Sequence, residues 1–440
     1  AISCFKFEEV EELIGGDEKL VPHLSGLSLD RNQNFPETFV KLLDAYRAEP
    51  SWDNKMCLEV GYYLWCSQVE YLKHHMDMHG ADKNRMDVLE SMVNMLSSAT
   101  VRICGLTSRN LVSYEGEALY LSVKEYLARM LYKNDELSQT CLAKIERIYR
   151  SMWNACPFSH SITRRLAIAL DDTTMFCPGL MELRNQKAIQ LFDLLYKDKE
   201  CAIEDLFMAL ERGMVVSRMQ HKYDEVIQKS DDIIGKYLQG VDDDPKLVRF
   251  YAIALDYKAE AYALKHDIDR ALETIKSAYS YFARDYENEP DDAQRLHSLV
   301  INLEKQVRYG FYSGMIPQIE ILLYLKFCHV AIDKNPGDAF AYKQLAVGEV
   351  MALYVSALRD DCDYIERHSR QTFDLVKEVI FSCRDWRIAN AEIMRATISM
   401  LSDNGHADLA NSMDLMYQSL ATEVLGKRLA PSAYFYPQGI

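Results

Sequence analysis

Two histidines in the segment KHHMDMHG form the first pattern in this chain that could bind a metal. His75 and His79 lie four residues apart, so they share one face if the segment is helical, and imidazoles at this spacing can hold zinc. The segment lacks the HExxH pattern, and no third protein ligand can be named from the sequence. A histidine near the end of a helix also interacts favourably with the negative end of the helix dipole. The sequence therefore predicts a solvated helix end here and no metal site.

An acidic run, DDCDYIE, contains Asp360, Asp361, Asp363 and Glu366. Carboxylates spaced as DDxxD on a helix can bind magnesium for diphosphate chemistry, as they do in all-α terpene synthases. The spacing here is DDxD, and no second metal motif follows it. Because aspartate is also a favoured N-cap residue, we expect Asp360 and Asp361 to cap the helix that follows Arg359. A magnesium-dependent enzyme of the prenyl diphosphate type remains the less favoured alternative.

A thiol and an imidazole stand close together in the sequence at Cys156 and His160. Nucleophilic catalysis needs a base and an oxyanion hole placed in space, and closeness along the chain does not supply that geometry. The patterns GxSxG and GxGxxG and a phosphate loop do not occur either. The sequence therefore predicts no catalytic residue, no cofactor and no enzyme.

The overall composition is that of an ordinary folded chain with an acidic surface. Of its 440 residues, 49% are hydrophobic and 26% are charged, and the formal net charge is −16. Nucleic-acid binding needs clustered Lys and Arg to neutralise phosphates, and no such cluster is visible. We therefore expect no nucleic-acid partner.

The number and spacing of the cysteines indicate the redox environment of the protein. Eleven are scattered singly, without a CxxC pair, and most lie in apolar helical runs where a free thiol acts as a small hydrophobe. This usage favours a reducing environment, so we expect a cytoplasmic location. No apolar run of the length needed for a membrane span is present, and we expect none.

Apolar residues recur at helical spacing through most of the chain. From Pro36 on, Phe39, Leu42, Leu43 and Tyr46 form one such stripe, and residues 115–133 and 135–154 read as an antiparallel pair of helices. Only 18 Gly and 11 Pro interrupt the chain, which favours long helices over short strands. No stretch alternates as a strand does. The sequence predicts an all-α fold.

The segment LDYKAEAYALKHDIDRALETIKSA carries a more specific pattern. Ala259, Tyr262, Ile268, Ala271 and Ala278 fall at positions that face one another in two helices joined by a tight turn at 266–267. Small residues at these positions let two helix backbones approach closely. The pattern resembles a tetratricopeptide repeat (TPR), and AIDKNPGDAFAYKQLA resembles the end of one repeat and the start of the next. The resemblance implies a helical scaffold that binds other proteins.

The repeat is degenerate and covers mainly residues 200–350. Tyr223 and Ile268 take equivalent positions 45 residues apart, whereas a uniform array repeats every 34 or so. We therefore expect antiparallel hairpins stacked as an irregular TPR-like solenoid, with an unrelated helical bundle as the alternative. The expected divisions are an N-terminal helical region at 1–155, an irregular junction at 156–182 that contains a turn at 171–174, a TPR-like hairpin array at 183–428 and an extended tail at 429–440.

The resemblance also implies a concave binding groove lined by the first helix of each hairpin. Mapping the repeat pattern onto this chain places nine residues on that face: Glu211, Val215 and Arg218, then Asp256, Glu260 and Ala263, then Phe340, Lys343 and Val347. The Lys and Asn residues with which the chaperone-binding members of this family hold a C-terminal carboxylate are absent. A basic or mixed peptide suits Asp256 and Glu260 better.

These features favour a non-enzymatic scaffold or adaptor that binds a peptide or a partner helix, as part of a larger complex. The alternative is a regulatory protein whose groove senses a small peptide or a metabolite. No sequence feature identifies the partner.

Overall fold

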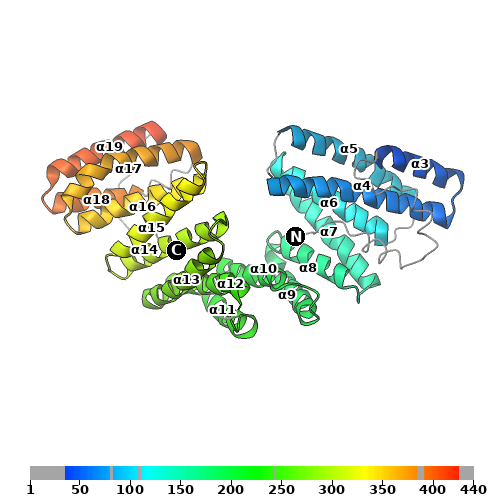
Figure 1. Ribbon diagram of the computed structural model, residues 1–440, viewed down its shortest axis with the longest axis horizontal. Coiled ribbons are helices and arrows are strands. Elements are labelled where there is room, and N and C mark those ends of the chain that lie inside the picture. The colour runs from blue at the N-terminus through cyan, green and yellow to red at the C-terminus, as the bar shows by residue number, and fades with distance from the viewer. Residues whose placement is uncertain (1–34, 80–82, 107–110, 242–243, 384–390, 426–440) are drawn as a thin grey trace. The chain divides into compact units, whose positions relative to one another are not determined.

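Helices and the turns that join them form the described structure (Figure 1). The computed structural model describes residues 35–79, 83–106, 111–241, 244–383 and 391–425. Within these ranges no strand occurs, and most consecutive helices pack against each other. The predicted all-α fold of stacked antiparallel hairpins is confirmed. The predicted extended tail at 429–440 lies outside the described residues.

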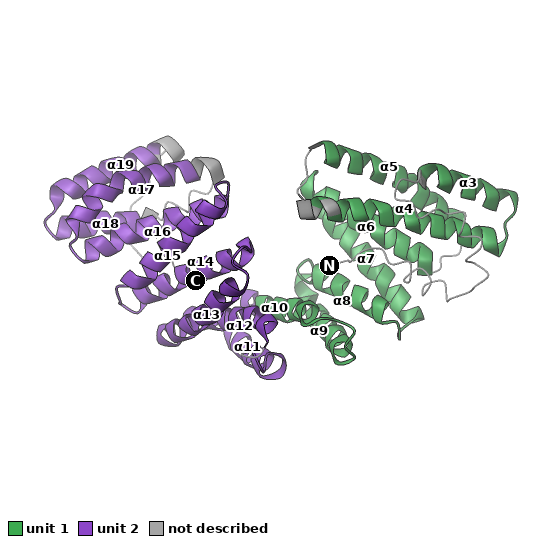
Figure 2. Cartoon of the chain, viewed as in Figure 1, with its two compact units in different colours: residues 1–216 green, residues 217–440 purple. Residues whose placement is uncertain are grey.

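The chain divides into two compact units, residues 1–216 and 217–440 (Figure 2). Unit 1 contains α3 (Phe35–Ala48), α4 (Trp52–His79), α5 (Lys83–Leu106), α6 (Leu111–Met130), α7 (Asp135–Ala155), α8 (His160–Thr174), the short 3-10 helix η1 (Pro178–Leu180), α9 (Met181–Lys197) and most of α10 (Ile203–Met219). Unit 2 contains α11 (Tyr223–Tyr237), α12 (Pro245–Leu264), α13 (Ile268–Asn288), α14 (Ala293–Tyr312), α15 (Gln318–Lys334), α16 (Ala339–Leu358), α17 (Cys362–Cys383), α18 (Ala391–Asp403) and α19 (Ala407–Leu425). No described helix is both long enough and apolar enough to cross a membrane.

A left-handed residue recurs in the turns that join these helices. In the α12–α13 hairpin, His266 has a φ of +60°, and the N–H of Asp267 donates to the carbonyl of Tyr262 at 2.9 Å. The Asp267 carboxylate then caps α13 by accepting from the N–H of Arg270 at 3.4 Å. This Schellman turn closes one helix and starts the next within three residues. A positive φ occurs at the equivalent place in five further turns, at Lys199, His221, Gly314, Asp360 and Gly405.

The α12–α13 hairpin is the one that the repeat pattern predicts, and its helices are confirmed. Ala259, Ala271 and Ala278 are fully buried, and Tyr262 packs against the cluster formed around the first two. Because these side chains end at Cβ, the two helices approach closely without leaving a gap.

One stretch differs from the sequence-based expectation. Residues 171–174, expected as a turn inside an irregular junction, belong to the last turn of α8. The hydroxyls of Thr173 and Thr174 donate to the carbonyls of Ala169 and Leu170 at 2.7 and 2.8 Å. Threonine can bond back to its own helix in this way, so a polar run need not end it. The division of the chain at 156–182 stays a prediction.

Unit 1 contains a close approach between α4 and α6 at a glycine. A Cβ on Gly116 would lie 2.7 Å from Cε1 of Tyr62, whose side chain is fully buried. Tyr62 cannot move easily, because its hydroxyl is hydrogen-bonded to the Thr100 hydroxyl of α5 at 2.7 Å. Gly116 therefore sets the distance between the two helices.

We expect Gly116→Ala to destabilise unit 1 by about 1–3 kcal/mol, because the added methyl group overpacks this contact. Gly105→Ala is the matched control, since nothing lies within 4 Å of a Cβ at that exposed position on α5. Urea unfolding followed by circular dichroism measures both. Equal midpoints for the two variants would contradict this account of the α4–α6 contact.

Candidate functional site

The two acidic residues of the predicted groove are already paired inside unit 2. Nζ of Lys305 on α14 lies 2.5 Å from Oδ2 of Asp256 and 3.3 Å from Oε2 of Glu260. Arg218 also contacts Glu260, at 2.7 Å. Burial opposes the charge on Lys305, but the two carboxylates outweigh this effect and raise its pKa. A basic peptide at this place would have to displace Lys305.

The remaining predicted groove residues are spread over different surroundings. Ala263 and Val347 are buried, with exposed fractions of 4% and 6%, and offer little surface to a partner. The Phe340 ring lies 4.2 Å from that of His297, and Lys343 is half-buried. The structure thus brings Arg218, Asp256 and Glu260 together. Glu211 and Val215 precede residue 217 and belong to unit 1.

A cavity that the sequence did not indicate lies in unit 1. Its volume is about 640 Å³, and most of its wall comes from α4, α6, α7 and α8. Apolar side chains such as Leu119, Leu142, Ile145 and Ile168 form part of this wall. The charged residues that line it are Glu70, Lys73, Glu125, Arg164, Arg165, Asp172 and Glu200, together with His160.

Glu70 is the most buried acid of this wall, with 6% of its surface exposed. Its Oε1 accepts from Nζ of Lys73 and from the Ser122 hydroxyl, each at 3.2 Å. Its Oε2 is also buried and has no hydrogen-bond partner among the described residues. A buried carboxylate oxygen without a donor is costly, so a donor brought next to it would be stabilising.

The arginines of the cavity are held by acids outside its lining. Arg164 forms a two-bond pair with Asp205, with both distances 3.0 Å, and Arg165 pairs with Glu115. Their positive charges are therefore neutralised. Lys73 likewise pairs with Glu70, so the uncompensated negative charge of the wall comes from Asp172.

Asp172 lines the cavity, where it is exposed to solvent although protein atoms surround most of the side chain. This burial, together with the neighbouring Asp171 carboxylate, raises the pKa of Asp172 to about 6, against the opposing effects of Arg212 and Lys73. Asp172 forms no hydrogen bond or ion pair with another described residue. A bound cation would favour its ionised form.

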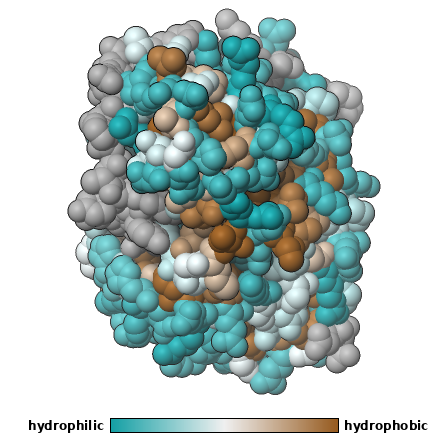
Figure 3. Space-filling view, turned by 90° about the vertical axis from the view of Figure 1, so that its left-hand side faces the viewer, coloured by the Kyte–Doolittle hydropathy of each residue, from teal (hydrophilic) through white to brown (hydrophobic). Residues whose placement is uncertain are grey.

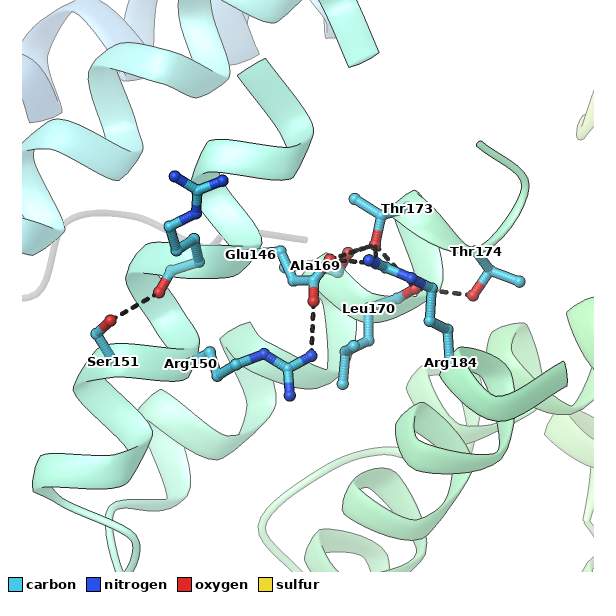
Figure 4. A network of polar contacts seen from close by, with 9 residues as sticks. Glu146, Arg150, Ser151, Ala169, Leu170, Thr173, Thr174 and Arg184 are labelled. Atoms are coloured by element: carbon cyan, nitrogen blue, oxygen red, sulfur yellow. Dashed lines mark hydrogen bonds and ion pairs between the residues drawn. The ribbon is translucent and has the colours of Figure 1, made fainter. Parts of the chain in front are cut away.

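A polar network holds α8 in place beside α7 and α9 (Figure 4). Glu146 accepts from Arg150 at 2.6 Å and from Thr173 at 3.1 Å, and it also pairs with Arg184. Arg184 donates in turn to the Thr173 hydroxyl at 2.8 Å. Burial alone would raise the pKa of Glu146, but the two arginines outweigh it and lower the pKa. The network fixes the helix that carries Arg164, Ile168 and Asp172 into the cavity wall.

The other sequence candidates do not join this site. The His160 ring lies 3.4 Å from the Glu200 carboxylate and 3.8 Å from that of Asp198, so it pairs with acids and not with the Cys156 thiol. The side chains of His75 and His79 lie outside the described residues. Asp361 caps α17 as predicted, accepting from the N–H of Tyr364 at 3.1 Å, whereas Asp360 does not cap and contacts His406 instead.

Unit 2 carries exposed apolar side chains around the start of α15. Met315, Ile316, Ile319 and Leu322 are between 45% and 71% exposed. Figure 3 shows apolar patches among a mostly hydrophilic surface on one face of the molecule. Clustered apolar exposure is typical of surfaces that contact other molecules.

Only one weak feature of the sequence points to the cavity. Glu70 and Lys73 interrupt an apolar face of α4 at a spacing of three residues. Nothing in the sequence says that Ser122 of α6 and Asp172 of α8 approach the same space.

Comparisons with known proteins give little beyond this geometry. No family model and no curated protein matches the chain. The human IFIT1 dimer with PPP-AAAA is 11% identical, the match covers 89% of this chain and 95% of that one, and the TM-score is 0.30. A monomeric IFIT1 mutant with Gppp-AAAA is also 11% identical, over 90% and 97% of the two chains, with a TM-score of 0.31. At this identity and TM-score the likeness carries no argument about function.

We expect Arg184→Met to destabilise unit 1 by about 3 kcal/mol at neutral pH, because it leaves the buried Glu146 without one of its two arginines. Arg150→Met is the control, since Arg150 is half exposed and its loss should cost less than about 1 kcal/mol. Chemical unfolding at several pH values measures both variants.

The pH dependence follows from the lowered pKa of Glu146. The stabilisation from its ion pairs is complete above the unfolded-state pKa of about 4.3 and is lost as the pH falls through the lower folded-state pKa. The difference between wild type and Arg184→Met should therefore shrink in acid. A difference that grows as the pH falls would contradict the assigned ion pair.

Proposed function

We propose that this chain is a non-enzymatic binding protein that receives a cationic side chain of a peptide or protein partner in the unit 1 cavity. The observation that carries the proposal is the Glu70 side chain in the cavity wall, whose carboxylate keeps one buried oxygen without a hydrogen-bond donor among the described residues. A guanidinium or ammonium group supplies the missing donor together with a positive charge.

The charges of the wall support this choice of ligand. Arg164 and Arg165 are neutralised by Asp205 and Glu115, while Asp172 has no ion-pair partner among the described residues. An anionic ligand would meet the unpaired Asp172, whereas the positive charge of Lys73 in the wall is already paired with Glu70. A cationic ligand can pair with Asp172 and with the Glu70 carboxylate.

The size and the apolar part of the wall support a side chain as the ligand. A volume of about 640 Å³ falls in the range of small-molecule sites. Leu142, Ile145 and Ile168 can cover the methylene stem of an arginine or lysine while the charged end reaches Glu70. Phe158, at 94% exposure, also lines the cavity and offers a flat apolar surface to the neighbouring part of a partner.

The groove predicted from the repeat pattern is kept as a second surface of the same binding protein. Arg218, Asp256 and Glu260 lie together in unit 2, where Lys305 occupies the position that a basic residue of a partner would take. A partner there would replace Lys305 in its contacts with the two carboxylates. The unit 1 cavity needs no such displacement, and for this reason it is the favoured site.

Fluorescence anisotropy with an array of labelled arginine-containing peptides tests the proposal. We expect saturable binding of a subset, and at least about tenfold weaker binding when citrulline, which is uncharged, replaces the arginine. Glu70→Gln and Asp172→Asn should each weaken binding by a similar factor, because each removes one negative charge from the wall. Asp232→Asn, on the exposed face of α11, is the matched control and should leave binding unchanged.

Three outcomes would speak against the proposal. Equal affinity for arginine and citrulline peptides would exclude charge recognition. Equally tight binding of free N-acetylarginine amide would favour the metabolite-sensing alternative over a peptide partner. Tight binding of a single-stranded RNA, with no peptide bound, would overturn the ligand class.

The raised pKa of Asp172 predicts how binding depends on pH. Because this carboxyl titrates at about 6, its negative charge is nearly complete at pH 7.5 and mostly lost at pH 5. Affinity for a basic peptide should fall over this range. In Asp172→Asn the fall should be smaller, and an unchanged pH profile in that variant would show that another group titrates.

A further inference from the structure

Two turns of unit 2 bring three potential metal ligands together. Asp360 lies in the α16–α17 turn and Cys362 is the first residue of α17, while His406 lies between α18 and α19. Asp360 has a φ of +60° and Gly405, which precedes His406, has a φ of +90°, so both turns reverse the chain tightly. His406 is more than 40 residues away from Asp360 and Cys362 in the sequence.

The donor atoms are close enough for one ion. One oxygen of Asp360, the Cys362 sulfur and a ring nitrogen of His406 all lie within 4.8 Å of one another. Nε2 of His406 is 2.7 Å from Oδ1 of Asp360, so the imidazole already points toward the carboxylate. In a tetrahedral zinc site, bonds of about 2.0–2.3 Å separate the ligand atoms by about 3.3–3.8 Å. Small side-chain rotations suffice to reach this geometry.

We propose that Asp360, Cys362 and His406 form a zinc-binding site that joins the α16–α17 turn to the α18–α19 turn. The three residues supply three ligands, and water completes the tetrahedron. Binding releases the proton of the Cys362 thiol to solvent, since the thiolate is the ligand.

The ligand types point to zinc rather than magnesium. Thiolate and imidazole favour zinc, whereas magnesium prefers oxygen ligands in an octahedron. The sequence-based alternative of a magnesium site in the acidic run does not fit these positions, because Asp361 is used as the N-cap of α17. Asp361 and Asp363 act on Cys362 as nearby negative charges, which favour the approach of a cation.

A bound ion would cross-link two consecutive hairpins of unit 2. Helices α17 and α19 already pack together, and α16 packs on α18. A ligand that binds only the folded state stabilises it by an amount that grows with the logarithm of its concentration over its dissociation constant. Zinc should therefore raise the thermal unfolding temperature of the full chain.

Cobalt(II) is the probe, because a thiolate bound to tetrahedral cobalt gives a charge-transfer absorption band. The reduced full-length chain, freed of metal, should take up one tight equivalent of cobalt with this band, and zinc should displace it. Cys362→Ser should abolish the band, and His406→Ala should abolish the tight equivalent. Cys177→Ser is the matched control, a half-buried cysteine outside the cluster, and should leave the titration unchanged.

A second measurement separates loss of the site from loss of the fold. The three ligands lie at turns and are at least partly exposed, so both variants should retain the wild-type helical circular dichroism without metal. Zinc should raise the unfolding temperature of the wild type and of Cys177→Ser and leave that of the two ligand variants unchanged. A band that persists in Cys362→Ser, or a zinc-dependent shift that persists in both ligand variants, would overturn the proposal.

Discussion

The hydrogen bond that closes six of the described helix–helix turns is the interaction on which much of the rest of the structure depends. A left-handed residue follows the end of one helix, and the next N–H donates to the carbonyl five residues earlier, as Asp361 does to Ser356 at 2.8 Å and His406 to Leu401 at 2.8 Å. The residue that donates this bond often caps the following helix. Short turns force consecutive helices to lie antiparallel and side by side. The apolar stripes of both helices then meet, and the packed layers of each unit follow.

The turn also explains why side chains with chemistry gather at hairpin ends. Asp360 cannot act as an N-cap because it holds the left-handed position of its turn, and this position leaves its carboxylate free to reach His406. The residue after it, Asp361, takes the cap. One backbone geometry thus assigns different roles to two neighbouring aspartates that the sequence presents as equivalent.

Charge pairing decides which acids remain able to bind a partner. The chain carries a net charge of −16, yet the buried carboxylate of Glu146 and the half-buried carboxylates of Asp256 and Glu260 each meet an arginine or a lysine. Burying an acid without such a partner is costly, so most are compensated within the fold. In the cavity wall, Asp172 has no such partner, and one oxygen of Glu70 has no donor although the other pairs with Lys73. The proposed cavity site therefore depends on acids that the chain leaves incompletely compensated.

The sequence by itself determined the all-α fold, the α12–α13 hairpin and the N-cap of α17 at Asp361. These features depend on residues within a few positions of one another, so helical periodicity and the preference of aspartate for N-caps predict them. It misread residues 171–174 as a turn, because threonine hydroxyls can bond within a helix as readily as in a turn. Only the tertiary structure decided that Lys305 neutralises Asp256 and that Glu70, Ser122 and Asp172 share one cavity. Such pairings join positions dozens of residues apart, and they depend on how closely packed helices aim their side chains, which local sequence patterns do not specify.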